Sequence, residues 1–334
     1  MWLSMGGEST KASAVACANQ GLVKYWGKTD EVLRLPTNDS ISVCLDTLRT
    51  HTTVEFSDQF AHDSFSLDGA PSKDPRVFGH LDLIRTIAGS SKRARVESRN
   101  TFPAAVGFAS SASGFAALTV AGCAALGLSL SASELSRIAR RGSASASRSI
   151  PGGFSKLMVA PSDEGTIAVR LAGPTELDFL TVMVTVTSSR KLVGSTQGMK
   201  ITTETSPMFQ ARLAYLPAVI EKMGQSIAAR DSREVAHLAE VDTLNMHATM
   251  LTSEPPLIYW NCATIEVMRE IQALRRDGYC AYFSIDAGQN VFVNTTRSHG
   301  PKIHERLQKV SGVQTISESR PGEGARLVDD HLFR

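Results

Sequence analysis

Residues 102–114 read F-P-A-A-V-G-F-A-S-S-A-S-G and run directly into a stretch rich in alanine and leucine. Small residues let a backbone approach an anion closely, and a helix N-terminus offers unpaired N–H groups at the positive end of its dipole. The hydroxyl groups of Ser110, Ser111 and Ser113 can add donors to phosphate oxygens or a ligand to magnesium. The spacing matches neither G-x-x-x-x-G-K-[ST] nor G-x-G-x-x-G, so a tightly packed helix start remains the alternative interpretation.

Strand and helix patterns alternate on both sides of this loop. In the first half we expect strands at 14–18, 40–45, 50–56 and 93–98, and helices at 115–126 and 134–141. In the second half we expect a strand at 181–187, helices at 207–229, 232–250 and 263–276, and strands at 279–285 and 291–294. Asp231 and Glu234 form a capping-box pattern at the start of the helix 232–250. This order predicts an α+β protein of two lobes, with domains at 1–180 and 181–334.

The composition narrows the class of protein. The chain has 334 residues and a formal net charge of +2, which predicts no nucleic-acid partner. Its five cysteines contain no C-x-x-C pair, so reduced thiols are favoured over disulfides or a zinc site. The uncharged segment 101–133 has a mainly apolar part, 115–128, that is shorter than the roughly 20 residues of a membrane span. With no signal-sequence pattern at the N-terminus, we expect a cytoplasmic protein with no membrane partner.

Residues 24–28 read K-Y-W-G-K and follow the first expected strand. Lys24 and Lys28 bracket an aromatic pair and could hold a phosphorylated acid by charge, with Tyr25 adding a hydroxyl group. The alternative interpretation is a surface turn with Trp26 packed beneath it.

Two further segments carry polar groups at loop positions. Residues 140–154 read R-R-G-S-A-S-A-S-R-S-I-P-G-G-F, in which Ser143 and Ser145 present alternate hydroxyl groups and Arg148 can hold a carboxylate or phosphate. Residues 283–290 read F-S-I-D-A-G-Q-N, which places Asp286 where an apolar strand meets a turn. A carboxylate there could cap the turn or act as the base at a cleft.

Taken in order, these segments resemble the GHMP kinase superfamily and, within it, the mevalonate diphosphate decarboxylase group. The most specific mark is A-N-Q-G-L-V-K-Y-W-G-K at 18–28. The other marks are L-P-T-N-D-S-I-S at 35–42, A-S-S-A-S-G at 109–114, R-R-G-S at 140–143, K-L-V-G-S-T-Q-G-M at 191–199, E-T-S-P at 204–207, D-A-G at 286–288 and R-P-G-E-G-A at 320–325. The resemblance implies an N-terminal lobe like ribosomal protein S5 domain 2 and a ferredoxin-like C-terminal lobe, with the active site between them.

The resemblance also implies roles for single residues. Asp286 matches the catalytic aspartate, and Arg148 the arginine that meets the substrate carboxylate. Three more catalytic positions are matched by Ser111, Asn19 and Lys24. Substrate-phosphate contacts are matched by Tyr25, Lys28, Ser143, Ser145 and Ser195. The nucleotide side is assigned to Lys92, Arg93, Ser98, Gly107, Ser110, Ser111, Ser113 and Gly114.

The implied reaction phosphorylates the C3 hydroxyl group of a phosphorylated mevalonate and then releases phosphate and carbon dioxide. It requires ATP and Mg²⁺, with the metal held through ATP and Ser111 as a candidate ligand. The implied partner is this small-molecule substrate, and a homodimer is expected from the habit of the family.

Departures from the usual family pattern bear on the substrate. The segments Q-G-L-V-K-Y at 20–25 and D-S-I-S-V-C at 39–44 look more like phosphomevalonate decarboxylases than diphosphomevalonate decarboxylases. Asp39 adds an anion near the expected phosphate site, and Thr196 stands where some bacterial members have an arginine, so both disfavour a second phosphate. We therefore expect mevalonate 5-phosphate to be converted to isopentenyl phosphate. The alternatives are the diphosphate substrate, a mevalonate-type kinase without decarboxylation, and a non-catalytic metabolite-binding protein.

Overall fold

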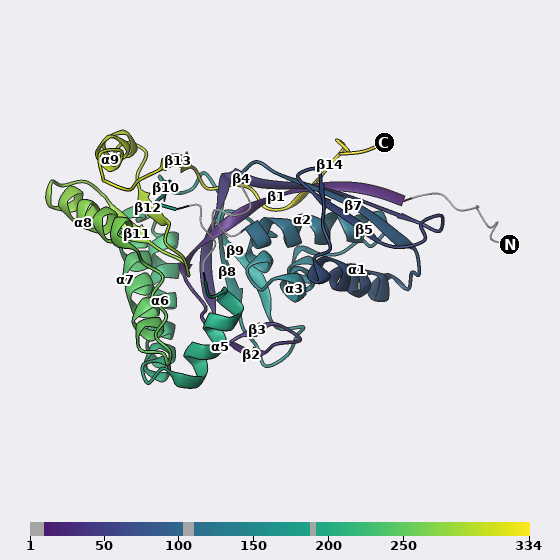
Figure 1. The fold of residues 1–334 in the computed structure, drawn as a ribbon, viewed down its shortest axis with the longest axis horizontal. Helices are drawn as coiled ribbons and strands as arrows, with labels where there is room; N and C mark the ends of the chain where they lie inside the picture. Colours follow the sequence, from purple (N-terminus) through teal and green to yellow (C-terminus); the bar gives the residue numbers. More distant parts are fainter. Residues whose placement is uncertain (1–9, 103–109, 188–191) are drawn as a thin grey trace.

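The computed structural model describes residues 10–102, 110–187 and 192–334, which form two lobes (Figure 1). In this part of the chain the first lobe has an eight-stranded sheet, with the long strands β1 (Thr10–Val23) and β4 (Ser40–Ser57) antiparallel at its centre. β4 pairs along its first half with β8 (Phe154–Met158) and along its second half with β7 (Arg93–Asn100). The other strands of this sheet are β5 (Ser64–Leu67), β6 (Ala70–Pro71), β9 (Ile167–Ala172) and β14 (Arg326–Val328).

Helices cover one face of this sheet (Figure 1). They are α1 (Pro75–Ala88), α2 (Ser110–Ala125), α3 (Ala132–Gly142) and the short α4 (Ala146–Ser149). Nearly all of α2 is buried, and its small residues let it lie close to β1 and β4. A separate hairpin of β2 (Lys28–Asp30) and β3 (Leu35–Pro36) extends below these helices in the view of Figure 1.

The second lobe carries a four-stranded antiparallel sheet in its described residues, in the order β11 (Tyr282–Ser284), β12 (Val291–Thr295), β10 (Leu180–Thr185), β13 (Thr315–Ser319). Counted along the chain, this order is 2-3-1-4, which is the ferredoxin-like arrangement that the resemblance implies. The helices α8 (Cys262–Arg276) and α9 (Gly300–Leu307) share an apolar core with this sheet.

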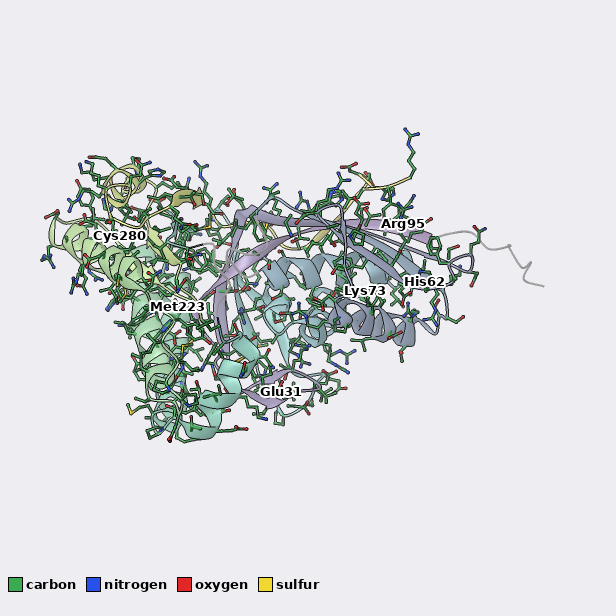
Figure 2. All side chains as sticks on the ribbon, in the orientation of Figure 1. Glu31, His62, Lys73, Arg95, Met223 and Cys280 are labelled. Carbon is green, nitrogen blue, oxygen red and sulfur yellow. The ribbon has the colours of Figure 1, made fainter. Side chains whose placement is uncertain are left out.

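The second lobe has three more helices, and the last two of them pack against the first lobe: α5 (Ser195–Thr205), α6 (Phe209–Ala228) and α7 (Ser232–Leu251). Met223 of α6 (Figure 2) and Val235 of α7 belong to the same buried apolar cluster as Leu22 of β1 and Ile41 of β4. Because one core spans both lobes, side chains contributed by each lobe are held in a fixed relation. No helix in the described ranges has the length and apolar character needed to cross a bilayer.

The chain crosses between the lobes a second time near its C-terminus. β14 pairs with β1 of the first lobe, and His331 Nδ1 lies 2.7 Å from Ser13 Oγ. Arg95, labelled in Figure 2, places its guanidinium over the Phe333 ring, with 4.0 Å between Arg95 Cζ and the ring centroid. The division at residue 180 stays a prediction, and the return of this C-terminal segment to the first lobe is a feature that the sequence patterns did not indicate.

Most expected elements are present, with shifted bounds. The strands expected at 40–45 and 50–56 form one continuous strand, β4, because it exchanges β8 for β7 as its neighbour without ending. The helix expected from residue 115 begins at Ser110, where Ser113 packs against Thr50 with 2.7 Å between the hydroxyl oxygens. The N-cap of α7 is confirmed, since Asp231 Oδ1 accepts the Glu234 N–H at 3.0 Å.

Candidate active site

Lys24 and Asp286 meet between the lobes although they lie far apart in the sequence. Lys24 directly follows β1, and its Nζ is 3.7 Å from Asp286 Oδ1. The ammonium group also donates to Ser284 Oγ at 2.6 Å and to the Gly21 carbonyl at 2.5 Å. The Lys24 side chain is 5% exposed and that of Asp286 is 33% exposed, so the carboxylate is the part of this pair that a substrate can reach. Burial lowers the pKa of Lys24, and the nearby Asp286 opposes that effect.

Arg148 lies on α4 next to this pair and is 4% exposed. Its Nη1 donates to Ser40 Oγ at 2.7 Å and its Nη2 to Asn19 Oδ1 at 3.3 Å, and its guanidinium lies 5.7 Å from the centre of the Tyr25 ring. Its Nε is buried without a hydrogen-bond partner, and no carboxylate among the described residues lies within ion-pair distance. Burial lowers the pKa of Arg148. A buried cation without an acidic partner is a suitable site for the carboxylate of a ligand.

A row of hydroxyl groups leads from Arg148 to the start of α2. Asn19 donates through its Nδ2 to the Ser145 carbonyl at 2.9 Å, which holds the loop before α4 against β1. Ser145 Oγ is 3.1 Å from Ser143 Oγ, which is 3.3 Å from Ser111 Oγ. The structure therefore brings together all five residues expected to be catalytic, with Ser143 and Ser145 between them.

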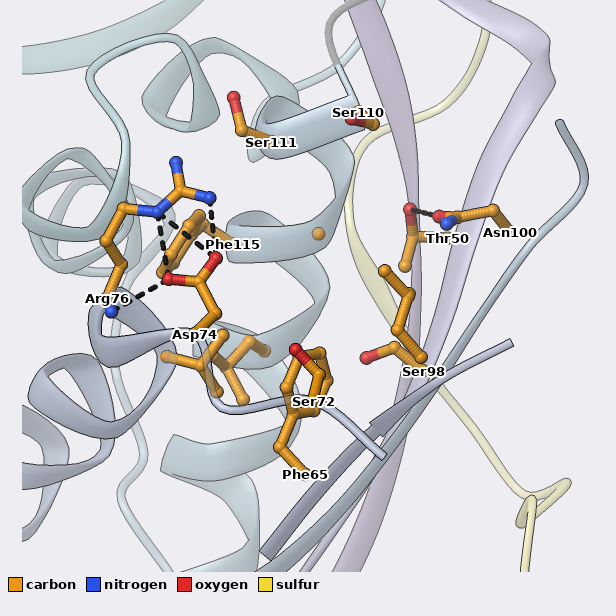
Figure 3. Close-up of a pocket in the computed structure, with 14 residues that line it drawn as sticks. Thr50, Phe65, Ser72, Asp74, Arg76, Ser98, Asn100, Ser110, Ser111 and Phe115 are labelled. Carbon is orange, nitrogen blue, oxygen red and sulfur yellow. Dashed lines mark hydrogen bonds and ion pairs between the residues drawn. The ribbon is translucent and has the colours of Figure 1, made fainter. Parts of the chain in front are cut away.

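A pocket opens beside the N-terminus of α2 (Figure 3). Ser110, Ser111 and Gly114 line it on the helix side, and Ser98 of β7 lines it opposite them. The rest of its lining is half apolar and half polar or charged: Phe65, Leu67, Val77, Phe115 and Leu118, and Thr50, Ser72, Asp74, Arg76 and Asn100. A pocket that combines apolar side chains with a helix N-terminus lacking acidic residues in its first turn can hold an aromatic base and the phosphates attached to it.

Three described residues that were expected on the nucleotide side, Ser113, Lys92 and Arg93, do not line this pocket. Ser113 is fully buried by its packing against Thr50. Lys92 lies 3.7 Å from Asp58, and Arg93 is exposed at the start of β7. Gly107 lies outside the described residues.

The residues expected to contact the substrate phosphate lie around the K-Y-W-G-K segment. Burial raises the pKa of Tyr25. Lys28 Nζ forms an ion pair with Glu31 at 2.6 Å. Ser195 and Thr196 open α5, which has no side-chain cap at its N-terminus.

Helix α5 packs against Trp26, since the indole N–H donates to Thr202 Oγ1 at 3.0 Å. This contact shows that Trp26 of the K-Y-W-G-K segment is packed beneath the surface, as the alternative interpretation of that segment expects. The two interpretations are compatible, because the buried indole holds α5 beside the neighbouring lysines.

Asp39 has a different environment from the one expected. Its Oδ2 forms a 2.9 Å ion pair with Lys156, and its Oδ1 accepts the Val159 N–H at 2.7 Å. The Asp39 charge is therefore compensated within the protein.

Sequence patterns missed several residues of this site. Asp242 and Arg212 bond to the backbone of Lys24, and Ser284 bonds to its ammonium group. His247 lies 3.3 Å from the carbonyl oxygen that precedes Asp286, and burial lowers the pKa of His247 to about 3. The only signal for Asp242 and His247 is that each is a polar residue on the buried face of α7.

No group of three or more histidine, cysteine, aspartate or glutamate side chains gathers into a metal site in 10–102, 110–187 and 192–334. Ser111, at the start of α2 and on the wall of the pocket, is the residue that fits the expected contact to a nucleotide-bound metal ion.

Models of one protein family match both lobes of this chain. One family model, described as the diphosphomevalonate decarboxylase-like N-terminal domain, matches residues 16–168. A second, described as the mevalonate 5-diphosphate decarboxylase C-terminal domain, matches residues 181–327.

Similar proteins carry two kinds of name. The phosphomevalonate decarboxylase of Haloferax volcanii is 38% identical and covers 91% of this chain and 94% of its own length. The diphosphomevalonate decarboxylase of Candida albicans is 36% identical and covers 97% of this chain and 99% of its own.

Solved structures agree with both lobes. Mevalonate diphosphate decarboxylase from Staphylococcus aureus superposes with a TM-score of 0.93 at 36% identity, over 96% of this chain and 99% of that one. A structure described as MDDEF in complex with MVAPP, AMPPCP and magnesium superposes with a TM-score of 0.91 at 36% identity, over 97% and 100%.

Proposed function

Because this chain belongs to the diphosphomevalonate decarboxylase family and has its GHMP kinase fold, we propose that it converts mevalonate 5-phosphate to isopentenyl phosphate in an ATP-dependent decarboxylation. The other products are ADP, phosphate and carbon dioxide. The observation that carries this proposal is the buried Arg148 guanidinium, which has no acidic partner among the described residues and lies beside Lys24 and Asp286. A site with a carboxylate base, a lysine cation beside it and a buried arginine that can bind a carboxylate fits the decarboxylation of a hydroxy acid.

The pocket beside α2 fits ATP. Phe115 and Leu118 would offer apolar surface for the base, and the N–H groups and hydroxyls at Ser110 and Ser111 (Figure 3) would bind the phosphates. Magnesium would reach the same place through the phosphates, with Ser111 as a ligand. MgATP, when bound there, supplies the phosphoryl group for the reaction.

A substitution at Gly114 tests this assignment. A Cβ atom at Gly114 would meet nothing within 4 Å, so the side chain of Gly114→Val begins in open space on the wall of the pocket. We expect the KM for ATP to rise by about tenfold, with no loss of folding stability because valine is no worse than glycine in a helix. Gly224→Val makes the same change in α6, where a Cβ atom would also meet nothing within 4 Å, and should leave the KM for ATP unchanged. Equal KM values for the two variants in steady-state kinetics would contradict the assignment.

Each residue between the lobes has a separate role in the proposed reaction. Asp286 accepts the proton of the C3 hydroxyl group as that oxygen attacks. Lys24 and the N-terminus of α2 stabilise the negative charge of the transferring phosphoryl group. Arg148 holds the C1 carboxylate in place until it leaves as carbon dioxide. The tertiary alcohol is a hindered nucleophile, so accurate positioning by these buried groups supplies much of the rate.

Support for the monophosphate comes from Thr196 and from sequence similarity. Thr196 lies at the N-terminus of α5, where the resemblance to the family implies an arginine in some bacterial members, and the Haloferax volcanii protein is named a phosphomevalonate decarboxylase. Asp39 supports the choice less than its charge suggested, because its ion pair with Lys156 neutralises that charge. The second candidate is the diphosphate substrate, which is favoured by the names of the other relatives described above.

A parallel assay separates the candidates. Magnesium and ATP are supplied with mevalonate 5-phosphate or mevalonate 5-diphosphate, and carbon dioxide, ADP and phosphate are measured together. We expect the three products in equal amounts with the monophosphate. Turnover of the diphosphate alone would identify the second candidate, and ADP without carbon dioxide would identify a kinase.

The same assay tests the role of Thr196. Thr196→Arg adds a guanidinium fork at the N-terminus of α5, and we expect it to raise kcat/KM for the diphosphate relative to the monophosphate by about tenfold. Thr205→Arg adds the same charge at the other end of α5 and serves as the control. An unchanged ratio in Thr196→Arg would mean that Thr196 does not take part in the choice of substrate.

A further inference from the structure

We propose that Arg212 and Asp242 are positioning residues, whose buried ion pair holds the main chain of Lys24 so that its ammonium group points at Asp286. This inference rests on the proposed function, because it concerns the lysine that stabilises the transferring phosphoryl group in that reaction.

The ion pair bonds to both backbone groups of Lys24. Asp242 Oδ2 accepts the Lys24 N–H at 2.8 Å, and Arg212 Nη2 donates to the Lys24 carbonyl at 2.9 Å. The same Arg212 nitrogen lies 2.9 Å from Asp242 Oδ1, which closes the arrangement. Lys24 lies just beyond the end of β1, where the bonds of the strand ladder stop, so its buried N–H and C=O groups need these partners.

The two charged residues are themselves fixed. Their side chains are 1% and 0% exposed, and Arg212 Nη1 also donates to Asn245 Oδ1 at 2.6 Å. Arg212 belongs to α6, whereas Asp242 and Asn245 belong to α7. The second lobe therefore holds the backbone of a lysine that belongs to the first lobe.

The other end of Lys24 is also held by the second lobe. Ser284 is the last residue of β11, in the sheet of that lobe, and it accepts from the Lys24 ammonium at 2.6 Å. Asp286 lies two residues further along the chain. With its backbone and its ammonium group both held, Lys24 has one orientation toward Asp286. A displacement of about 1 Å at such a group is enough to reduce a rate by about a hundredfold.

A buried ion pair is weak evidence for stability, because removing two charges from water costs about as much as their attraction returns. Asp242 has an electrostatic effect as well. Burial lowers the pKa of Lys24. The positive charges of Arg212 and Arg148 lower this pKa further, whereas the negative charges of Asp286 and Asp242 raise it. Asp242 therefore helps Lys24 to keep its proton, and the loss of its charge lowers the pKa of Lys24.

The neighbouring pair Glu240 and Arg275 provides a matched control. Glu240 lies on the same helix, two residues before Asp242, and is also buried. It accepts from Arg275 Nη1 at 2.8 Å and from the Phe283 N–H at 2.9 Å. Glu240 thus has the same kind of partners as Asp242, an arginine and a backbone N–H, but that N–H belongs to Phe283 and not to Lys24.

The experiment compares Asp242→Asn with Glu240→Gln. If Asp242 acts on Lys24, the alkaline limb of the pH profile of kcat moves to lower pH by about one unit in Asp242→Asn, because a neutral Lys24 forms at lower pH. The KM for ATP stays unchanged. Glu240→Gln shifts thermal stability but leaves the alkaline limb in place. Equal positions of the alkaline limb in Asp242→Asn and Glu240→Gln would overturn the proposal.

A second variant keeps the proposal testable if Asp242→Asn does not fold. Arg212→Lys retains both charges but has one nitrogen in place of the two that reach Asn245 and the Lys24 carbonyl. We expect kcat to fall by at least about tenfold while the KM for ATP is unchanged. A parental kcat in Arg212→Lys would contradict the positioning role.

A measurement without turnover separates this inference from the proposed function. NMR of ¹³Cε-labelled lysine follows the titration of Lys24, whose signal is assigned by its loss in Lys24→Arg. The Lys24 signal should titrate at lower pH in Asp242→Asn than in the parent or in Glu240→Gln. If the parent shows no ATP-dependent carbon dioxide release, the proposed function fails, and the NMR titration alone decides whether Asp242 controls Lys24.

Discussion

Asp286→Asn is expected to lower kcat by at least roughly 10²–10⁴-fold, the range for loss of a general acid–base group. Asparagine has the same shape but cannot accept the proton of the C3 hydroxyl group. In the parent, the Asp286 carboxylate lies 3.7 Å from the Lys24 ammonium and raises the pKa of Lys24. The substitution removes this negative charge, so Lys24 loses its proton more easily. The KM for ATP should change little, because Asp286 does not line the nucleotide pocket.

Single-turnover and steady-state rates of the purified variant measure this effect. Asp277→Asn is a suitable control, since it removes an exposed carboxylate of the same lobe that pairs with Arg306 at 3.0 Å. Its kcat should equal that of the parent. A near-parental rate in Asp286→Asn would show that another group accepts the proton.

Arg148→Gln is expected to reduce kcat/KM for the phosphorylated acid by about 30- to 5000-fold, which corresponds to the roughly 2–5 kcal/mol of a buried charge pair that loses one partner. The same substitution should not destabilise the folded protein. Arg148 is a buried cation without an acidic partner among the described residues, so a neutral side chain removes a desolvation penalty. We therefore expect a Tm equal to or above that of the parent.

Arg148→Lys separates charge from geometry. Lysine keeps the positive charge but has one nitrogen in place of the two that bond to Ser40 and Asn19, so its kcat/KM should lie between those of the parent and Arg148→Gln. Thermal melts and kinetics on the same samples provide both readouts. A lower Tm together with parental kinetics in Arg148→Gln would mean that Arg148 is a structural residue.

Local patterns predicted the elements better than the contacts between them. The N-cap at Asp231 could be predicted because capping depends on neighbours in the chain. The unbroken course of β4 could not, because the pairing partners of its two halves, β7 and β8, are distant segments. Helix α5 was also missed, since its threonines and glycine are poor helix formers and its position depends on the contact with Trp26.

The candidate site shows the same division. K-Y-W-G-K, the serine loops and the Asp-Ala-Gly corner are visible as patterns, and the resemblance to a family assigned their roles. Arg212 and Asp242 have no such pattern, because charged residues on long helices are usually solvated. Only the packing of α6 and α7 against the end of β1 shows that these two charges are buried at Lys24.

The return of the chain to its first lobe has a consequence for synthesis on the ribosome. β1 needs β14 as a neighbour, and the hydrogen-bonded residues Ser13 and His331 are 318 positions apart. At roughly 5–20 residues per second, translation leaves that edge of β1 uncovered for about 15–60 s. Open strand edges are templates for pairing with other chains. The nascent first lobe is therefore exposed to wrong strand pairing until the C-terminal segment emerges and covers it.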